Sequence, residues 1–298
     1  METPRKRRTN YRENVETGFD TLGDLYYDYW GDYFHLAVFG PGDDPSDFAG
    51  AFERTHEQYF HAIGGSAAGH ILDLACGGGA LSLWIADRSN AQVLGVDLSR
   101  AQLARARRRL VGRHRANLSF IQHDLMALGE LDVGPFDAAI CLDAFCYVPD
   151  RAQALRAVAS RLKRGARFLL VDWCRPERVR ALQRELILEP FYRNWGIGDL
   201  ETVGGYRRAF AAAGLRILQV EDLSERVAPN WERGYQAALR AVADPIAPRH
   251  LLSLARAVTT HGVGVVDVAK GQFLVALLAK AAADAGILRY VSILSERR

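Results

Sequence analysis

Short apolar runs alternate with stretches of helical periodicity through the middle of the chain. Five apolar runs have the length of strands and occupy residues 70–74, 92–96, 118–122, 136–142 and 166–171. Between them, residues 81–88, 100–112 and 151–162 repeat apolar positions every three or four residues, which predicts amphipathic helices. Strands that alternate with helices at this pace indicate a parallel sheet with helices on both faces.

Two later strand-like runs and two helical regions complete the pattern. The runs cover residues 215–220 and 288–294, the first of them after a helical stretch at 203–213. Residues 10–60 and 225–286 are predicted to be mainly helical, and we interpret both as a cap over the open end of the sheet. The predicted organisation is a helical cap segment with a disordered basic start at 1–60, a core at 61–224 with a cap insertion at 174–202, a helical cap insertion at 225–286 and a last core strand at 287–298.

The composition is that of an ordinary soluble globular protein of 298 residues, with 49% hydrophobic and 24% charged residues. A net charge of +3 is too small to indicate a nucleic acid partner, and the basic run at residues 5–8 is interpreted as a solvated tail. The chain has no run of 18 apolar residues and no apolar signal-peptide core, so neither a membrane span nor secretion is predicted. The sequence leaves the oligomeric state open and permits a homodimer.

The four cysteines, at positions 76, 141, 146 and 174, form no CxxC pair and have no zinc spacing. All of them lie in or beside apolar runs, which predicts buried or partly buried reduced thiols and a cytoplasmic location. No metal site is predicted.

The segment at residues 71–79 reads ILDLACGGG and carries the strongest functional signal. An apolar run, an acid, a glycine cluster and then a helical pattern indicate a strand, a tight turn and a helix start. Glycines in such a turn let a ligand approach the backbone closely. The helix N-terminus adds free N–H groups and a partial positive charge, so a nucleotide-like ligand is predicted here.

Acidic residues close or follow the first three predicted strands, at Asp73, Asp97 and Asp124. Ligands of open α/β sheets bind at the carboxyl ends of the strands. Asp97 can accept both hydrogen bonds of a ribose diol, and Asp124 can accept one from the exocyclic amine of adenine. Leu98 and Leu125 can flank the base. A dinucleotide loop would read G-x-G-x-x-G without an acid at its start, whereas Asp73 suits a ligand with an ammonium group and no phosphate, as in S-adenosylmethionine.

At these residues the chain resembles the class I S-adenosylmethionine-dependent methyltransferases. The matching motifs follow one another at fitting spacings, at residues 71–79, 93–99, 122–125, 136–143 and 162–170. The resemblance covers residues 64–220, with 288–294 as seventh strand. It implies an α/β fold with a Rossmann-like seven-stranded, mostly parallel sheet, helices on both faces and a mainly helical cap. It also implies S-adenosylmethionine as cofactor and S-adenosylhomocysteine as product.

The resemblance further implies cofactor-binding roles for ten residues. Those for the methionine part are Asp73, Ala75, Gly77 and Gly79, and Ala75 stands where the family usually has its first glycine. The ribose hydroxyls are assigned to Asp97, and Gln102 is expected to reach the ribose or the carboxylate. Adenine is assigned to Asp124 and Leu125, with Leu98 beside the base. The backbone of Cys141 is expected to face the ammonium. A helix cap remains the alternative for Asp73, and a turn residue for Asp97.

The acceptor side is predicted from the aromatic stretch at residues 26–35, which reads YYDYWGDYFH. This stretch can form an aromatic wall over a sulfonium or an amine, or simply a hydrophobic core. His35 and Tyr27 are the candidates for orienting or deprotonating the acceptor, and Tyr147 is predicted at the same mouth. Other aromatic residues expected around that mouth are Trp173, Phe191, Tyr192, Trp195 and Trp231.

Three stretches, at residues 26–39, at 222–224 with 229–231, and at 288–290, resemble the small-molecule subgroup of this class. That subgroup includes sarcosine and dimethylglycine N-methyltransferases, tocopherol and sterol C-methyltransferases and natural-product enzymes. This resemblance implies methyl transfer to an N or C nucleophile of a small, partly apolar acceptor. The open alternatives are an O-methyltransferase for a phenolic natural product, an RNA methyltransferase and a protein that binds the cofactor without catalysis. An RNA enzyme would need a basic face, and the arginines of residues 100–115 fit a solvated helix face better.

Overall fold

The computed structural model describes residues 11–12, 15–16, 18–20, 27, 31–113, 115–243, 258–259 and 265–298. The basic start at residues 5–8 lies outside the described residues. So do positions 26 and 28–30 of the aromatic stretch and positions 244–257 and 260–264 of the helical insertion.

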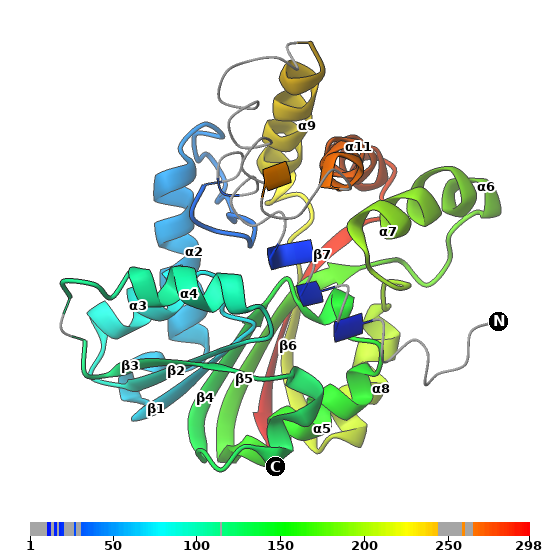
Figure 1. The fold of residues 1–298 in the computed structure, drawn as a ribbon. Helices are drawn as coiled ribbons and strands as arrows, with labels where there is room; N and C mark the ends of the chain where they lie inside the picture. Colours follow the sequence, from blue (N-terminus) through cyan, green and yellow to red (C-terminus); the bar gives the residue numbers. More distant parts are fainter. Residues whose placement is uncertain are drawn as a thin grey trace.

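Seven strands form one sheet in the order β3-β2-β1-β4-β5-β7-β6 (Figure 1). In chain order they are β1 His70–Leu74, β2 Gln92–Asp97, β3 Leu118–Gln122, β4 Phe136–Leu142, β5 Leu162–Cys174, β6 Leu215–Asp222 and β7 Arg289–Arg297. Strands β1 to β5 pair in parallel, whereas β7 runs antiparallel between β5 and β6. The predicted seven-stranded, mostly parallel sheet is therefore confirmed.

Strand β5 begins earlier than the sequence predicts. Leu162, assigned to the end of the preceding helix, pairs with Phe136, and the register then shifts so that Arg167 pairs with Ala138. Gly165 lies between them with a φ of 76°, which a glycine adopts without steric cost. The apolar run at 166–171 marks only the buried part of this strand.

Helices cover both faces of the sheet because successive strand residues point to opposite sides. Ile71 belongs to one buried cluster and Leu72 to the other. The helices on the Ile71 side are α2 Phe48–Ala62, α3 Ala80–Arg88 and α4 Arg100–Arg108. Those on the Leu72 side are α5 Arg151–Arg161 and α8 Val203–Ala212.

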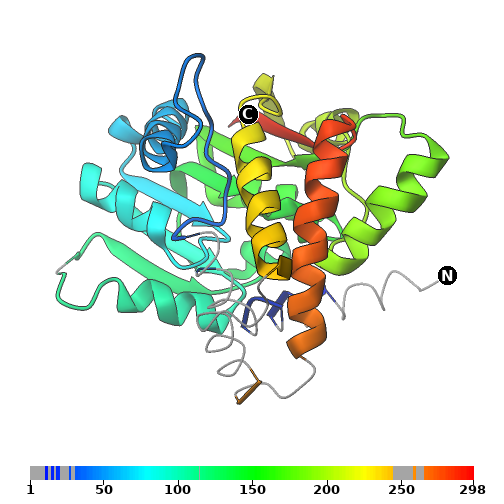
Figure 2. The ribbon, with the colours of Figure 1, turned by 90° about the horizontal axis from the view of Figure 1, so that it is seen from above.

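The cap lies over the carboxyl ends of the parallel strands (Figure 1). Its two long helices, α9 Ala228–Ala243 and α11 Val265–Asp284, pack side by side (Figure 2). Helix α11 also contacts α7, Glu189–Trp195, of the insertion that follows β5. Residues 31–47 form no helix, so the prediction of a mainly helical segment fails there. Their backbone groups are satisfied by distant partners instead: Asn230 exchanges two hydrogen bonds with Ala37, at 2.7 and 3.0 Å.

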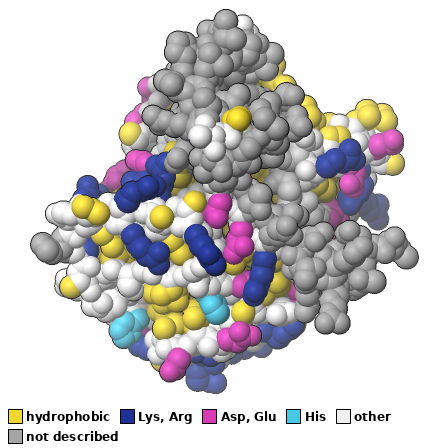
Figure 3. Space-filling model, in the orientation of Figure 1, with side chains coloured by type: hydrophobic (Ala, Val, Ile, Leu, Met, Phe, Trp, Pro, Cys, Tyr) yellow, Lys and Arg dark blue, Asp and Glu magenta, His cyan; other side chains and the backbone are white. Residues whose placement is uncertain are grey.

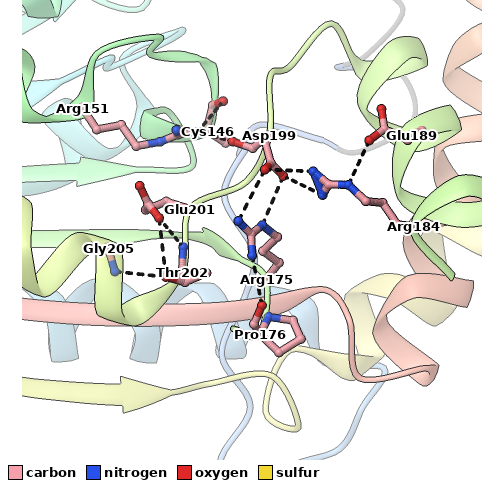
Figure 4. A network of polar contacts seen from close by, with 10 residues as sticks. All are labelled: Cys146, Arg151, Arg175, Pro176, Arg184, Glu189, Asp199, Glu201, Thr202 and Gly205. Carbon is pink, nitrogen blue, oxygen red and sulfur yellow. Dashed lines mark hydrogen bonds and ion pairs between the residues drawn. The ribbon is translucent and has the colours of Figure 1, made fainter. Parts of the chain in front are cut away.

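A polar network ties the insertion after β5 to the core (Figure 4). The carboxylate of Asp199 contacts both Arg175 and Arg184, at 3.2 and 2.9 Å. Arg151 of α5 donates to the carbonyl oxygens of Cys146 and Asp199, at 3.3 and 2.9 Å. These contacts join the loop after β4 to the insertion after β5. They thereby hold together the two segments that carry Tyr147 and Trp195.

Charged side chains of both signs are interspersed on the face shown in Figure 3. In the arginine-rich stretch at 100–115, Arg109 pairs with Asp32 at 2.6 Å and Arg115 with Asp87 at 2.5 Å. All four cysteines are free thiols, of which Cys76 is partly exposed and the others are buried. None of the described helices has the length and apolar character needed to cross a membrane.

Candidate active site

The turn after β1 has a backbone that depends on its small residues. Ala75, Gly77 and Gly79 all have positive φ angles, of 54°, 53° and 72°. The Cys76 N–H donates to the Val96 carbonyl at 3.0 Å and so ties the turn to β2. Gly79 then caps α3, whose N-terminus points its free N–H groups along the turn.

Two neighbouring strands end in a left-handed residue that is not glycine. Ala75 follows β1, and Asp143, with a φ of 53°, follows β4. The buried carboxylate oxygens of Asp143 make no well-aligned hydrogen bond. Burial raises the pKa of this carboxyl well above its ordinary value, and the nearby Tyr290 hydroxyl only partly opposes the shift. Strained backbone of this kind is concentrated at functional sites.

Replacing Ala75 by Gly is expected to stabilise the protein by about 0.5–1 kcal/mol. The left-handed conformation costs an L-residue about 1–2 kcal/mol, and the greater flexibility of glycine in the unfolded chain offsets about half of that. Urea unfolding measures the difference. Ala86→Gly, within α3, is the control and should cost at least about 1 kcal/mol. Destabilisation by both substitutions would contradict a strained Ala75.

Asp73 is the second-last residue of β1 and is buried. Its Oδ2 accepts a 2.5 Å hydrogen bond from the hydroxyl of Ser82 in α3. Burial raises the pKa of Asp73 to about 7, the Ser82 hydrogen bond lowers it, and the nearby Asp97 raises it. An ammonium group placed beside this carboxylate would stabilise the ionised form.

Asp97 ends β2 and holds two backbone segments in place. Its Oδ2 accepts from the Gly77 N–H and its Oδ1 from the Ser99 N–H, both at 2.8 Å. Burial raises the pKa of Asp97 to about 6. The two backbone hydrogen bonds lower the pKa and so offset only part of this shift. Since each carboxylate oxygen has a second lone pair, Asp97 can still accept from two hydroxyl groups of a ribose.

We expect the affinity for S-adenosylmethionine to rise with pH between 5.5 and 8. The ligand-free protein keeps Asp73 and Asp97 partly protonated because their pKa values are raised, and a cationic ligand needs the ionised forms. Between pH 7 and 6 the Kd should increase about tenfold per pH unit lost, and below pH 6, where both carboxyl groups are protonated, it should increase more steeply. Calorimetric titration across this range measures the change. Ser82→Ala should move the dependence to higher pH, and adenosine, which lacks the ammonium, should show a weaker one.

The same raised pKa values affect the stability of the ligand-free protein. Asp73 and Asp97 bind more protons in the folded than in the unfolded chain between about pH 4 and 7. Their contribution to stability is therefore greatest at low pH and is lost as the pH rises through this window. A pH-independent Kd for S-adenosylmethionine would contradict both expectations.

A cavity with a space of about 1110 Å³, part of it open to solvent, joins the turn to the aromatic segments. Among its described lining residues are four Asp and no Lys or Arg. Such a lining disfavours phosphates and suits a ligand with a sulfonium, an ammonium and hydroxyl groups, so these residues fit S-adenosylmethionine.

Most residues predicted for the site line this one cavity. They are His35, Asp73, Ala75, Gly77, Asp97, Leu98, Gln102, Leu125 and Tyr147. The predicted aromatic residues Trp173 and Trp195 line it as well, whereas Phe191 lies behind Trp195 with its ring stacked at 6.2 Å and Tyr192 lies against Phe191.

Four predicted residues lie next to the cavity and do not line it. Gly79 faces Phe120, and Cys141 is fully buried within β4. Asp124 accepts from Met126 N–H at 2.9 Å and pairs with Arg12 at 2.6 Å, so an adenine amine would have to share this carboxylate with Arg12.

Tyr27 is the fourth of these residues and reaches the cofactor end instead of the acceptor end. Its hydroxyl donates to Gln102 at 2.7 Å, and the Arg105 guanidinium lies 3.6 Å from the centre of its ring. Tyr27 thus covers the glycine turn and positions Gln102. A direct role in deprotonating the acceptor stays a prediction without support from this geometry.

His35 is buried and bonded to a second histidine. Its Nε2 lies 2.8 Å from Nε2 of His56 in α2, and Tyr33 and Phe52 pack around the pair. Burial, with a smaller effect of His56, lowers the pKa of His35 well below its ordinary value. Burial also lowers the pKa of His56, to about 4. Both rings are therefore neutral at physiological pH.

Sequence reasoning missed one wall of the cavity. Tyr11, Val15 and Phe19 line it from the N-terminal segment, and Phe19 contacts Tyr147 with ring centres 5.6 Å apart. These three residues are spaced four apart, which is the helical periodicity that would have identified one apolar face. Phe34, within the predicted aromatic stretch, completes this wall.

The sequence matches known methyltransferases. Residues 71–165 match the family described as methyltransferase domain. Methyltransferase GfsG of Streptomyces halstedii is 30% identical over 210 residues, which are 69% of this chain and 70% of GfsG. The sterol 24-C-methyltransferase of Kluyveromyces lactis is 26% identical over 225 residues, 74% of this chain and 59% of the enzyme. The matched region thus spans less than two thirds of this sterol enzyme.

Solved structures share the whole fold. Mycolic acid cyclopropane synthase CmaA1, in complex with S-adenosylhomocysteine, superposes with a TM-score of 0.77 at 15% identity, covering 96% of this chain and 98% of the other. Geranyl diphosphate C-methyltransferase of Streptomyces coelicolor A3(2) gives a TM-score of 0.68 at 17% identity, covering 97% and 98%.

The fold, the acid-headed glycine turn and these relatives define the class: the chain belongs to the class I S-adenosylmethionine-dependent methyltransferases. Within that class it is of the small-molecule type, as are its sterol and natural-product relatives.

Proposed function

We propose that this protein transfers a methyl group from S-adenosylmethionine to an N or C nucleophile of a small, partly apolar molecule. The observation that carries the proposal is that one cavity is lined both by Asp73 and Asp97 and by a set of aromatic side chains. The sterol 24-C-methyltransferase relatives support an apolar acceptor and reaction at carbon.

In the proposed complex, Asp73 holds the ammonium and Asp97 holds the ribose hydroxyls of the cofactor. When bound, S-adenosylmethionine supplies a methyl group that is already activated, so orientation of the acceptor can provide most of the rate. Phe34, Trp173 and Trp195 exclude water and press an apolar acceptor toward the cofactor end. Their faces also stabilise positive charge by about 0.5–2 kcal/mol.

An O-methyltransferase is the second candidate because of the paired histidines. A neutral His35, linked to His56, can accept the proton of a hydroxyl group and share it with its partner. A carbon nucleophile that loses its proton after methylation could use the same group. Turnover of labelled S-adenosylmethionine with a panel of amines, terpenoids, sterols and phenols separates these cases, and no turnover with any class would contradict the proposal.

Replacing His35 by Ala is expected to lower kcat at least tenfold while the Kd for S-adenosylmethionine changes less than twofold. The ring lines the cavity and contacts His56, Tyr33 and Phe52, to none of which we assign a part in cofactor binding. Turnover and calorimetry on the same preparation give the two numbers. His61→Ala, an exposed histidine on α2, is the matched control and should change neither. An equal loss of both quantities in His35→Ala would indicate a structural role.

A further inference from the structure

A second and smaller chamber, whose space of about 520 Å³ is partly open to solvent, adjoins the cofactor cavity under the cap helices. The two spaces share five lining residues, which are Tyr33, Phe34, His35, Trp173 and Trp195. Beyond these, the chamber is walled by apolar positions of α2, α9 and α11, with Trp231 and Val275 among them. The two spaces therefore meet at these five side chains, and α9 and α11 line the chamber beyond them.

The two spaces differ in the charged residues that line them. The described lining of the cofactor cavity has four Asp and no basic residue, whereas that of the chamber has Arg233 and no Asp or Glu. Asn230, the other strongly polar residue there, is occupied by its two hydrogen bonds to Ala37. Arg233 is thus the one charged group that the described part of the chamber offers to a ligand.

Arg233 has no carboxylate partner among the described residues. Its guanidinium carbon lies 4.4 Å from the centre of the Phe48 ring, and this is the contact that the structure shows for its charge. Desolvation lowers the pKa of Arg233, with no neighbouring acid to oppose the shift. Half-buried charges are usually paired because an unpaired one loses hydration without compensation. A ligand anion would supply the missing partner.

We propose that the chamber binds the apolar body of the methyl acceptor and that Arg233 binds an anionic group, a carboxylate or a phosphate, at the end of that body. The inference rests on the proposed function and narrows its substrate class to elongated amphipathic acids. The reacting atom lies at the other end, near His35, in a cavity whose described lining has no Lys or Arg to pair with an anionic group. Charge therefore sets the direction in which the acceptor enters.

Binding of decyl compounds to the full-length protein tests this proposal, with the fluorescence of Trp173, Trp195 and Trp231 as the signal. Decanoate and decyl phosphate are expected to bind at least about tenfold more tightly than decanol, and decyltrimethylammonium more weakly than decanol. Whichever anion binds more tightly identifies the kind of acid. Each titration is made with and without saturating S-adenosylhomocysteine, so that failure of the cofactor site is seen separately from failure of the chamber.

Arg233→Met keeps an unbranched apolar side chain without the charge and should abolish the preference for the two anions without weakening the binding of decanol. Arg240→Met, an exposed arginine two turns further along α9, is the control and should keep the preference. Ala276→Phe fills the chamber from α11 and should weaken all four probes, which tests the site independently of Arg233. Equal binding of decanol and decanoate by the unaltered protein, no binding of any probe, or an anion preference that survives Arg233→Met would overturn the proposal.

Discussion

Replacing Asp97 by Asn is expected to raise the Kd for S-adenosylmethionine at least about 100-fold. The carboxylate receives the Gly77 and Ser99 N–H groups and still has lone pairs for two ribose hydroxyls. An amide turns one acceptor into a donor, so it opposes a backbone N–H or a ribose hydroxyl. Two hydrogen bonds to a charged group are worth about 1.5–3 kcal/mol each, and 3 kcal/mol corresponds to more than a hundredfold in Kd.

Calorimetry at pH 8 is the measurement, because Asp97 is then ionised in the unaltered protein. Asp97→Ala removes both acceptors and is expected to abolish binding. Asp87→Asn changes a surface carboxylate that pairs with Arg115, and should leave the Kd within twofold. Unaltered affinity in Asp97→Asn would remove the basis for placing the ribose at the end of β2.

Replacing Gly79 by Ala is expected to destabilise the fold by about 3 kcal/mol. Gly79 has a φ of 72°, and an added Cβ would lie 2.7 Å from Phe120 Cζ and 2.8 Å from Ala106 Cβ. The left-handed backbone costs alanine about 1–2 kcal/mol, and overpacking costs about 1–3 kcal/mol more. Because Gly79 starts α3, the shift would also move the turn that faces the cofactor.

Urea unfolding and cofactor titration of the same variant measure the two effects. Gly112→Ala is the matched control, since Gly112 has a φ of 75° and no atom within 4 Å of the added Cβ. It should show the backbone cost alone, about 1 kcal/mol, with full cofactor affinity. Similar losses for both variants would mean that close packing against β3 does not matter at Gly79.

The strands and the helices between them could be predicted because their signal is local. Apolar runs such as residues 70–74 and 118–122 coincide with β1 and β3 since the buried faces of a parallel sheet need continuous apolar positions. The early start of β5 could not be predicted, because Leu162 pairs with Phe136 through a register shift that depends on both strands. Residues 31–47 misled the prediction because their aromatic side chains pack in the cap without helical backbone.

At the site, prediction worked for residues whose position follows from the strand that carries them. Asp73 and Asp97 end neighbouring parallel strands, so they had to meet at one edge of the sheet. The roles of Asp124 and Tyr27 depend on the N-terminal segment, which brings Arg12 to the first and places the second on Gln102. The sequence contains no local signal for such contacts between distant segments.

The sequence alone determined the class of protein, since an acid-headed glycine turn and acids at successive strand ends specify a cofactor with an ammonium, a diol and no phosphate. Tertiary structure alone decided where the acceptor lies, because residues from the N-terminal segment, the β5 insertion and α9 meet there. It also left Arg233 without an acidic partner among the described residues, in a chamber next to a cavity lined by four aspartates. Burial and charge separation of this kind arise only when distant segments pack together.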